Sequence, residues 1–261
     1  MDSAISLGKL FGIQFKLHFS WFIIFILVTV FLVYPGYSHW LYWVIGITTS
    51  LLFFASVVAH ELAHSLVGRA NGIPIQSITL FIFGGVSQMT KEAARPGAEL
   101  KMAVAGPLCS LVIGGLFSLV WLFVPNLPQP VALMILWLAA MNIAVLATFN
   151  LIPGFPLDGG RILRALLWRF TGNYARSTRI AARIGQGIGS LFILGGIAII
   201  FRHPFSLSWF DGIWIAFIGL FLLSVASASY RQIQRPEVAY RFTTSGVTPP
   251  DSPAVPPDTA N

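Results

Sequence analysis

The feature that most constrains this chain is a series of apolar stretches, each long enough to cross a lipid bilayer as a helix. A hydrocarbon core of roughly 30 Å takes about 20 helical residues. Because only 10% of the 261 residues are charged, a water-soluble globular domain is excluded. The pattern predicts an all-α polytopic membrane protein with about six transmembrane helices. They are expected at residues 17–34, 40–68, 102–124, 131–152, 184–201 and 209–227.

The two ends of the chain differ in composition. We expect residues 1–230 to form one membrane-embedded core. Residues 231–261 are rich in Pro, Ser, Thr and Asp, a composition that cannot bury enough apolar surface to fold. This segment is therefore predicted to be a disordered cytoplasmic tail.

The formal net charge of +7 raises the question of nucleic-acid binding, and the positions of the basic residues answer it. With six spans, every Lys and Arg except Arg202 falls on one side of the membrane. The positive-inside rule places that side in the cytoplasm. The charge therefore indicates a multi-pass protein of the cell membrane with both termini cytoplasmic. Its surroundings are the lipid bilayer, and no nucleic-acid partner is expected.

The second apolar stretch contains the sequence HELAH, which places His60, Glu61 and His64 where a spanning helix normally carries no charge. Residues i and i+4 share one face of a helix, so the two histidines can offer nitrogens to one metal ion. Glu61 beside them can act as a general base that takes a proton from water. An ionised side chain at the centre of a span costs about 3 kcal/mol and usually marks function. Two packed histidines are the alternative.

A third metal ligand is expected, because a hydrolytic zinc site uses three protein ligands and one open position. Apart from Glu61 and Asp158, the acidic residues lie in the termini, in a charged loop or at the outer end of the last span. Asp158 follows the fourth stretch in FNLIPGFPLDGGR, where Pro153 and Pro156 break the helix. If the second and fourth stretches both enter from outside, Asp158 reaches a depth similar to that of His60 and His64.

Two motifs in this order resemble those of the site-2 protease family of intramembrane zinc metalloproteases. The first is HELAH, and the second has the form N-x-x-P-x-x-x-x-D-G. Asn150, Pro153, Asp158 and Gly159 match the second motif position for position. The segments AGP at 105–107 and FGG at 83–85 are also similar to segments of that family.

The resemblance implies one zinc ion per chain, with His60, His64 and Asp158 as ligands and Glu61 as the catalytic base and acid. It implies a transmembrane or membrane-anchored protein as substrate, cut within or next to its membrane segment in regulated intramembrane proteolysis. Since water is a reactant, the active site is expected to open toward the cytoplasm. Many relatives carry PDZ or CBS modules, and no segment here resembles either, which favours a compact form.

Five residues are candidates for substrate binding: Asn150, Pro153, Asn142, Gly84 and Gly85. Either asparagine can instead bridge two helices, since Asn side chains form hydrogen bonds between spans. The two glycines interrupt β-branched and aromatic residues at 73–89, which predicts a short re-entrant β-hairpin. Its edge can bind an unwound substrate by strand addition, or the glycines can simply make a tight turn.

Other functions are compatible with ionisable residues inside a membrane. A metal transporter or a metal-binding membrane scaffold also uses intramembrane His and Asp residues. Transport, however, requires polar groups along the whole depth of the helix bundle, and here they cluster at one depth. A catalytically silent relative that only binds its partner is a further alternative, and the intact Glu61 argues against it.

Overall fold

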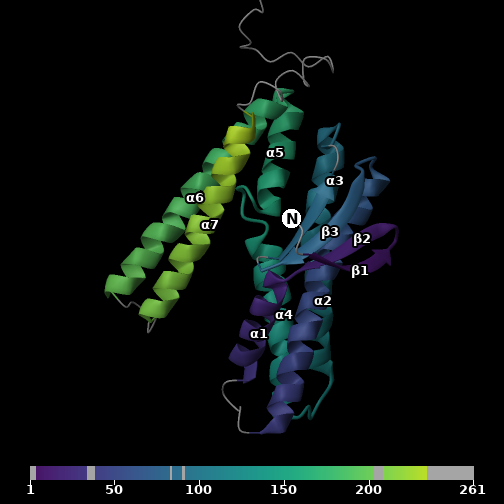
Figure 1. Ribbon diagram of the computed structural model, residues 1–261, viewed down its shortest axis with the longest axis vertical. Helices are drawn as coiled ribbons and strands as arrows, with labels where there is room; N and C mark the ends of the chain where they lie inside the picture. Colours follow the sequence, from purple (N-terminus) through teal and green to yellow (C-terminus); the bar gives the residue numbers. More distant parts are fainter. Residues whose placement is uncertain (1–3, 34–38, 83, 90–91, 203–207, 234–261) are drawn as a thin grey trace, which may run out of the picture. The chain divides into compact units, whose positions relative to one another are not determined.

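The computed structural model describes residues 4–33, 39–82, 84–89, 92–202 and 208–233 (Figure 1). The chain forms two compact units. The first comprises Met1–Ile152 and Leu157–Ile162, and the second comprises Pro153–Pro156 and Leu163–Asn261. Most of the tail predicted at 231–261 lies outside the described residues, but its first three residues belong to helix α7 (Trp209–Ile233).

The first unit contains a four-stranded sheet. Strands β1 (Ala4–Leu10) and β2 (Ile13–His18) form one antiparallel hairpin, and β3 (Ile75–Phe81) and β4 (Gly84–Met89) form another. Because β2 pairs with β3 in parallel, the strand order is β1-β2-β3-β4. The second hairpin confirms the β segment predicted at 73–89, whereas the first hairpin is an addition to the predicted fold.

The first predicted span differs from the structure in where its helix begins and in its length. The residue expected to begin it, Leu17, belongs to β2, and the helix that follows, α1 (Ser20–Val33), has only 14 residues. In β2, buried Ile13, Phe15 and Leu17 alternate with less buried polar residues, which is the period of a strand. The apolar run in the sequence merged the end of this strand with the helix, because both are rich in apolar residues.

Among the described residues, five helical segments are long and apolar enough to cross a membrane. They overlap the other five predicted stretches, so the prediction of a mostly helical, polytopic fold is confirmed. These segments are α2 (Trp40–Ala70), α3 (Pro96–Phe123), α4 (Gln129–Ala140) continued by the π-helix η2 (Met141–Phe149), α6 (Tyr174–Arg202) and α7.

The helix before the second motif ends as the prolines predicted. η2 ends at Phe149, and Asn150 caps it. After an irregular segment, helix α5 (Asp158–Thr171) begins at the candidate metal ligand. A π-helix is rare and often occurs next to a functional site, so this geometry directs attention to the segment that follows it.

The sheet packs against the helices that carry the HELAH motif and the AGP motif (Figure 1). One buried cluster joins β2 and β3 to Met102 of α3, and Val58 and Leu62 of α2 pack against it. A second cluster contains Leu17 and Leu80 of the sheet together with residues of α2 and η2. The sheet therefore holds α2 through apolar contacts at residues just before the motif and at Leu62 within it.

The second unit is built around the helices α6 and α7, which approach each other through glycines. A Cβ atom at Gly196 would lie 2.5 Å from the carbonyl oxygen of Gly212, and one at Gly212 would lie 2.7 Å from the carbonyl oxygen of Gly196. Gly189 and Gly219 form a similar pair two turns away. Small residues allow helix backbones to approach closely in a membrane, so these four positions set the spacing of the pair.

Candidate active site

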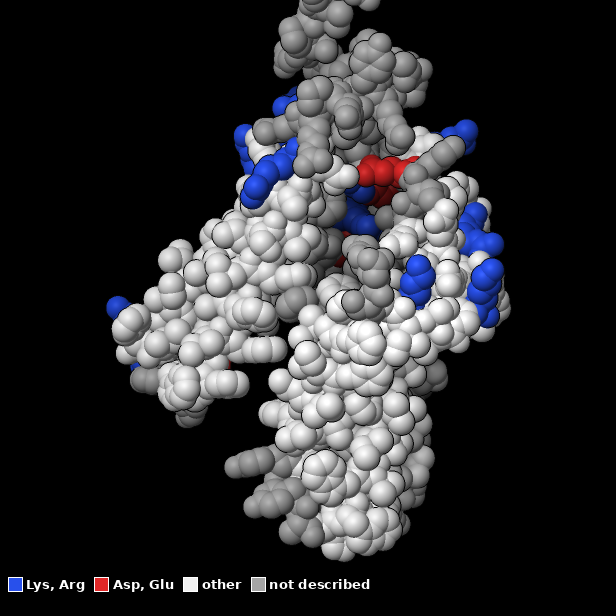
Figure 2. Space-filling model, in the orientation of Figure 1, with Lys and Arg blue, Asp and Glu red and all other residues white. Residues whose placement is uncertain are grey.

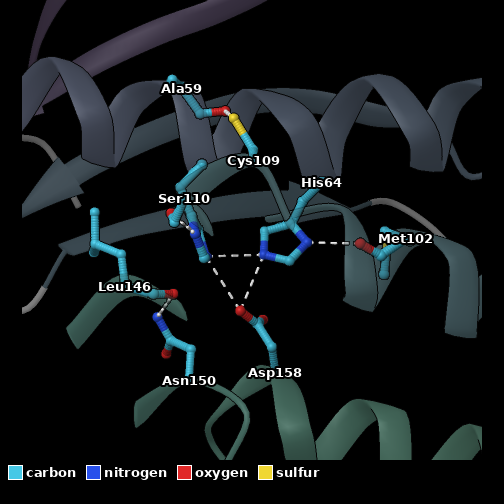
Figure 3. A network of polar contacts seen from close by, with 9 residues as sticks. Ala59, His64, Met102, Cys109, Ser110, Leu146, Asn150 and Asp158 are labelled. Carbon is cyan, nitrogen blue, oxygen red and sulfur yellow. Dashed lines mark hydrogen bonds and ion pairs between the residues drawn. The ribbon is translucent and has the colours of Figure 1, made fainter. Parts of the chain in front are cut away.

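Three of the predicted site residues converge in the first unit. His60 and His64 lie one turn apart on α2, and Asp158 is the first residue of α5. The Nε2 atoms of both histidines lie 3.1 Å from Asp158 Oδ2 and 3.1 Å from each other. Figure 3 shows the side chains of His64 and Asp158 pointing toward each other. Both imidazoles are buried, with 3% and 6% of their surface exposed.

The second ring nitrogen of each histidine is held by α3. His64 Nδ1 lies 2.7 Å from the main-chain carbonyl oxygen of Met102. Because a carbonyl oxygen only accepts hydrogen bonds, this Nδ1 carries a proton, which leaves Nε2 of the neutral ring as the nitrogen able to bind a metal ion. His60 Nδ1 lies 2.9 Å from Ser110 Oγ. Both rings therefore present Nε2 toward Asp158.

The three residues fit a zinc ion by their chemistry and spacing. Two imidazole nitrogens and one carboxylate oxygen are a donor set found in catalytic zinc sites. Ligands about 2.0–2.2 Å from a tetrahedral zinc ion lie roughly 3.3 Å from one another. The observed separations of 3.1 Å are close to this value. His60, His64 and Asp158 are also a group able to hold a metal ion among the residues that the structure describes.

The backbone of α3 closes one side of this group at Gly106. A Cβ atom at Gly106 would lie 2.7 Å from His60 Nε2 and still closer to His64 Nε2. A side chain therefore cannot be accommodated without moving the imidazoles. In the sequence, AGP was only a segment similar to one of the family, and the structure shows that its glycine leaves room for the Nε2 atoms of His60 and His64.

Glu61 lies against the sheet. A Cβ atom at Gly85 of β4 would overlap Glu61 Cγ and would lie 2.9 Å from Cδ. The main chain of β4 thus touches the carboxylate side chain, which requires glycine at this position. Arg161, on α5 three residues after Asp158, adds a positive charge near Glu61. Gly84 has a φ of +120° and open space around its Cβ position, so its backbone conformation suits a turn.

The remaining candidates for substrate binding differ in their contacts and in the unit to which they belong. Asn150 Nδ2 donates to the Leu146 carbonyl at 3.1 Å, and its own carbonyl accepts from Gly159 N at 2.6 Å. The second bond joins the two ends of the second motif. Pro153 is exposed and belongs to the second unit.

Asn142 has the contacts of a residue that bridges two helices. Its side chain is 0% exposed. Nδ2 donates to the Leu138 carbonyl at 2.9 Å and to Ser56 Oγ of α2 at 3.3 Å. These contacts favour the helix-bridging alternative over a direct contact with substrate.

Sequence reasoning missed the part that α3 plays in the site. Ser110 is fully buried and bonds a metal-ligand candidate, but a serine in an apolar span carries no pattern that distinguishes it from a packing residue. The Met102 contact uses a main-chain oxygen, which any residue would supply. Neither contact could be found without the positions of two helices relative to each other.

Comparison with known proteins agrees with this geometry. Residues 48–134 and 125–194 match the family model described as Peptidase family M50. The chain is 43% identical over 262 residues to a protein of Synechocystis named as a zinc metalloprotease, covering 98% of this chain and 67% of that protein. It is 36% identical over 234 residues to Rip3 of Mycobacterium tuberculosis, also named as a zinc metalloprotease, covering 87% of this chain and 58% of Rip3.

A solved structure shows the same fold. The site-2 protease from Methanocaldococcus jannaschii superimposes with a TM-score of 0.61 and 33% sequence identity, over 87% of this chain and 95% of that one. Together with the apolar helices, these matches identify a multi-pass membrane protein. The chain belongs to peptidase family M50 and has the fold of a site-2 protease, in a family of zinc metalloproteases.

Proposed function

We propose that this chain hydrolyses a peptide bond within or next to the transmembrane segment of a membrane protein, in regulated intramembrane proteolysis. His60, His64 and Asp158 hold one zinc ion, and Glu61 is the general base and acid. The observation that carries the proposal is the convergence of three ligand atoms at 3.1 Å beside Glu61, inside a helical membrane protein. The metal-transporter and scaffold alternatives have no comparable support.

The reaction uses few residues of this chain. The chemistry that a zinc ion supplies when bound in this site is Lewis acidity toward a peptide carbonyl and a water molecule. Glu61 accepts a proton from the attacking water and later donates it to the leaving amine. The bond between His64 Nδ1 and the Met102 carbonyl keeps the imidazole oriented during both proton transfers.

The position of β4 supports a mode of substrate binding. β4 is an edge strand of the sheet, and its main chain touches Glu61 at Gly85. A helical substrate protects its own peptide groups, so it must become extended before cleavage. An extended segment added to β4 through main-chain hydrogen bonds would pass beside Glu61. Gly84 and Gly85 belong to this proposed binding region, and Asn150 is a candidate for substrate binding through its place in the second motif.

The proposed topology has both termini in the cytoplasm and the site on the cytoplasmic side. It counts the short helix α1 as the first crossing and follows from the distribution of Lys and Arg along the sequence. His60 lies 20 residues after Trp40, the first residue of α2, which is roughly 30 Å of helix. On one face of the first unit, Figure 2 shows basic side chains over the sheet and none over the lower ends of α1, α2 and α4.

One experiment tests the metal site and the base together. Wild-type protein, Glu61→Gln and His60→Ala are purified in mild detergent, and zinc per chain and cleavage of a panel of tagged single-span proteins are measured. Wild type and Glu61→Gln are expected to hold about one zinc ion, and His60→Ala at least tenfold less. Cleavage by Glu61→Gln is expected to fall by about 10² to 10⁴-fold.

Two results would contradict the proposal. A Glu61→Gln protein that cleaves at the wild-type rate excludes Glu61 as the base. A His60→Ala protein with full zinc content excludes the ligand set. If wild-type protein holds zinc and cleaves none of the panel, zinc flux into sealed vesicles is measured next. Flux through the wild-type protein would favour the transporter over the protease.

A further inference from the structure

The two candidate histidine ligands are anchored in different ways. His64 Nδ1 is bonded at 2.7 Å to the main-chain carbonyl of Met102, which remains in place whatever side chain occupies that position. His60 Nδ1 is bonded at 2.9 Å to Ser110 Oγ, which one substitution removes. The Nδ1 side of the His60 ring is therefore held by a single hydroxyl group.

We propose that Ser110 is a positioning residue for metal binding. Its hydroxyl oxygen accepts a hydrogen bond from His60 Nδ1–H, which holds the ring orientation that directs Nε2 toward Asp158. The inference rests on the metal site of the proposed function, and it adds a residue outside the ligand set and outside both sequence motifs. Ser110 lies in α3, 50 residues from His60 along the chain.

The surroundings of Ser110 make this bond difficult to replace. Ser110 is 0% exposed and His60 is 3% exposed, so bulk water cannot take the place of the hydroxyl. Without Ser110 Oγ, His60 Nδ1 would therefore lose the partner that holds this side of the ring. In metal sites, loss of the group that orients a ligand histidine typically weakens metal binding about 10–100-fold.

The helix that carries Ser110 also contacts both imidazoles, through Gly106. Gly106 lies one turn before Ser110 on the same face of α3, where its missing side chain lets the backbone lie against both imidazoles. Glycine at one turn and serine at the next thus have complementary tasks. Gly106 leaves space for the metal-binding nitrogens, and Ser110 holds the opposite nitrogen of one ring.

The same helix offers a matched control. Ser118 lies two turns after Ser110, and its hydroxyl donates to the carbonyl of Gly114 in its own helix at 2.8 Å. Replacing Ser118 by Ala removes the same atom from the same helix without touching a histidine. A difference between the two variants therefore reports the contact with His60 and not a general effect of a lost hydroxyl in α3.

The test measures zinc affinity of the full chain in detergent by competition with a chromophoric chelator, for wild type, Ser110→Ala, Ser118→Ala and His60→Ala. The visible absorption of the cobalt(II)-loaded proteins is recorded in parallel. Ser110→Ala is expected to bind zinc about 10–100-fold more weakly with an altered cobalt spectrum. Ser118→Ala is expected to stay within about twofold of wild type.

Thermal unfolding of the metal-free proteins separates positioning from folding. The inference requires that metal-free Ser110→Ala unfolds within about 4 °C of metal-free Ser118→Ala. Unchanged zinc affinity in Ser110→Ala overturns the inference while leaving the metal site intact. A much lower unfolding temperature overturns it in favour of a packing role. If wild type binds zinc no better than His60→Ala, the metal site of the proposed function is wrong as well.

Discussion

The pairs α2–α3 and α6–α7 bring two long helices together with different kinds of residues. Between α2 and α3, imidazole nitrogens bond to Ser110 and to the Met102 carbonyl. Between α6 and α7, the close approach is made by glycines such as Gly196 and Gly212, with a hydrogen bond from Gln186 to Ser227.

The difference shows which helix pair contains buried polar side chains and how they are stabilised in a membrane. An unpaired polar group in hydrocarbon costs several kcal/mol, so buried histidines persist only where other elements supply partners. In the first unit the partners come from α3 and α5. In the second unit glycines provide the close approach, together with polar contacts such as those of Gln186 with Ser227 and of Arg183 with Tyr230. Changes in the first pair should therefore affect metal binding, and changes in the second pair should affect stability.

The largest effect is expected from adding one methyl group at Gly106. Gly106→Ala places a Cβ atom 2.7 Å from His60 Nε2 and still closer to His64 Nε2, so the two rings cannot keep their spacing to Asp158. Zinc affinity is expected to fall by about 100-fold or more, because sites of this kind tolerate displacements of only about 0.5 Å. Chelator competition measures the change.

Gly115→Ala is the control for Gly106→Ala. It adds the same atom to the same helix at a position with no neighbour within 4 Å, and it should bind zinc like wild type. If Gly106→Ala also binds zinc like wild type, α3 does not constrain the metal site, and the contrast between the two helix pairs is lost.

A medium effect is expected in the second pair. Gly196→Ala forces a Cβ atom to within 2.5 Å of the Gly212 carbonyl, and overpacking of this kind lowers the free energy of unfolding by about 1–3 kcal/mol. Gly195→Ala, on the same helix with nothing within 4 Å of its Cβ position, should show no such loss. Equilibrium unfolding in mixed micelles compares them, and zinc affinity should be equal in both. A selective loss of zinc in Gly196→Ala would show that the pairs are not separable in this way.

The smallest effect is expected for a polar contact remote from the metal site. Thr29 Oγ1 of α1 donates to Ser50 Oγ of α2 at 2.8 Å. Hydrogen bonds between membrane helices contribute about 0.6 kcal/mol on average, so a double-mutant cycle with Thr29→Val and Ser50→Ala should give a coupling of this size in unfolding experiments. Thr48, whose hydroxyl bonds its own helix at Val44, gives the control. A coupling above about 2 kcal/mol would mean that polar contacts stabilise the first unit even where no metal ligand is involved.

Several parts of the fold could be predicted because their signals are local. The long apolar helices follow from length and composition, and the β3–β4 hairpin follows from residue types around Gly84 and Gly85. The β1–β2 hairpin was missed because an apolar run continued from Leu17 into α1 and hid the alternation of the strand. A change of period within one apolar run is a weaker signal than the run itself.

The sequence by itself determined which groups are available for chemistry. The spacing of His60 and His64 places both on one helix face, and the second motif supplies Asp158, because these patterns depend only on residue type and helical period. Only the tertiary structure decided that Asp158 Oδ2, 94 residues from His64, meets both Nε2 atoms at 3.1 Å. It also decided that Ser110, the Met102 carbonyl and Gly106 surround the rings. These contacts join separate helices, and their geometry depends on how the helices pack, which no local pattern of residues specifies.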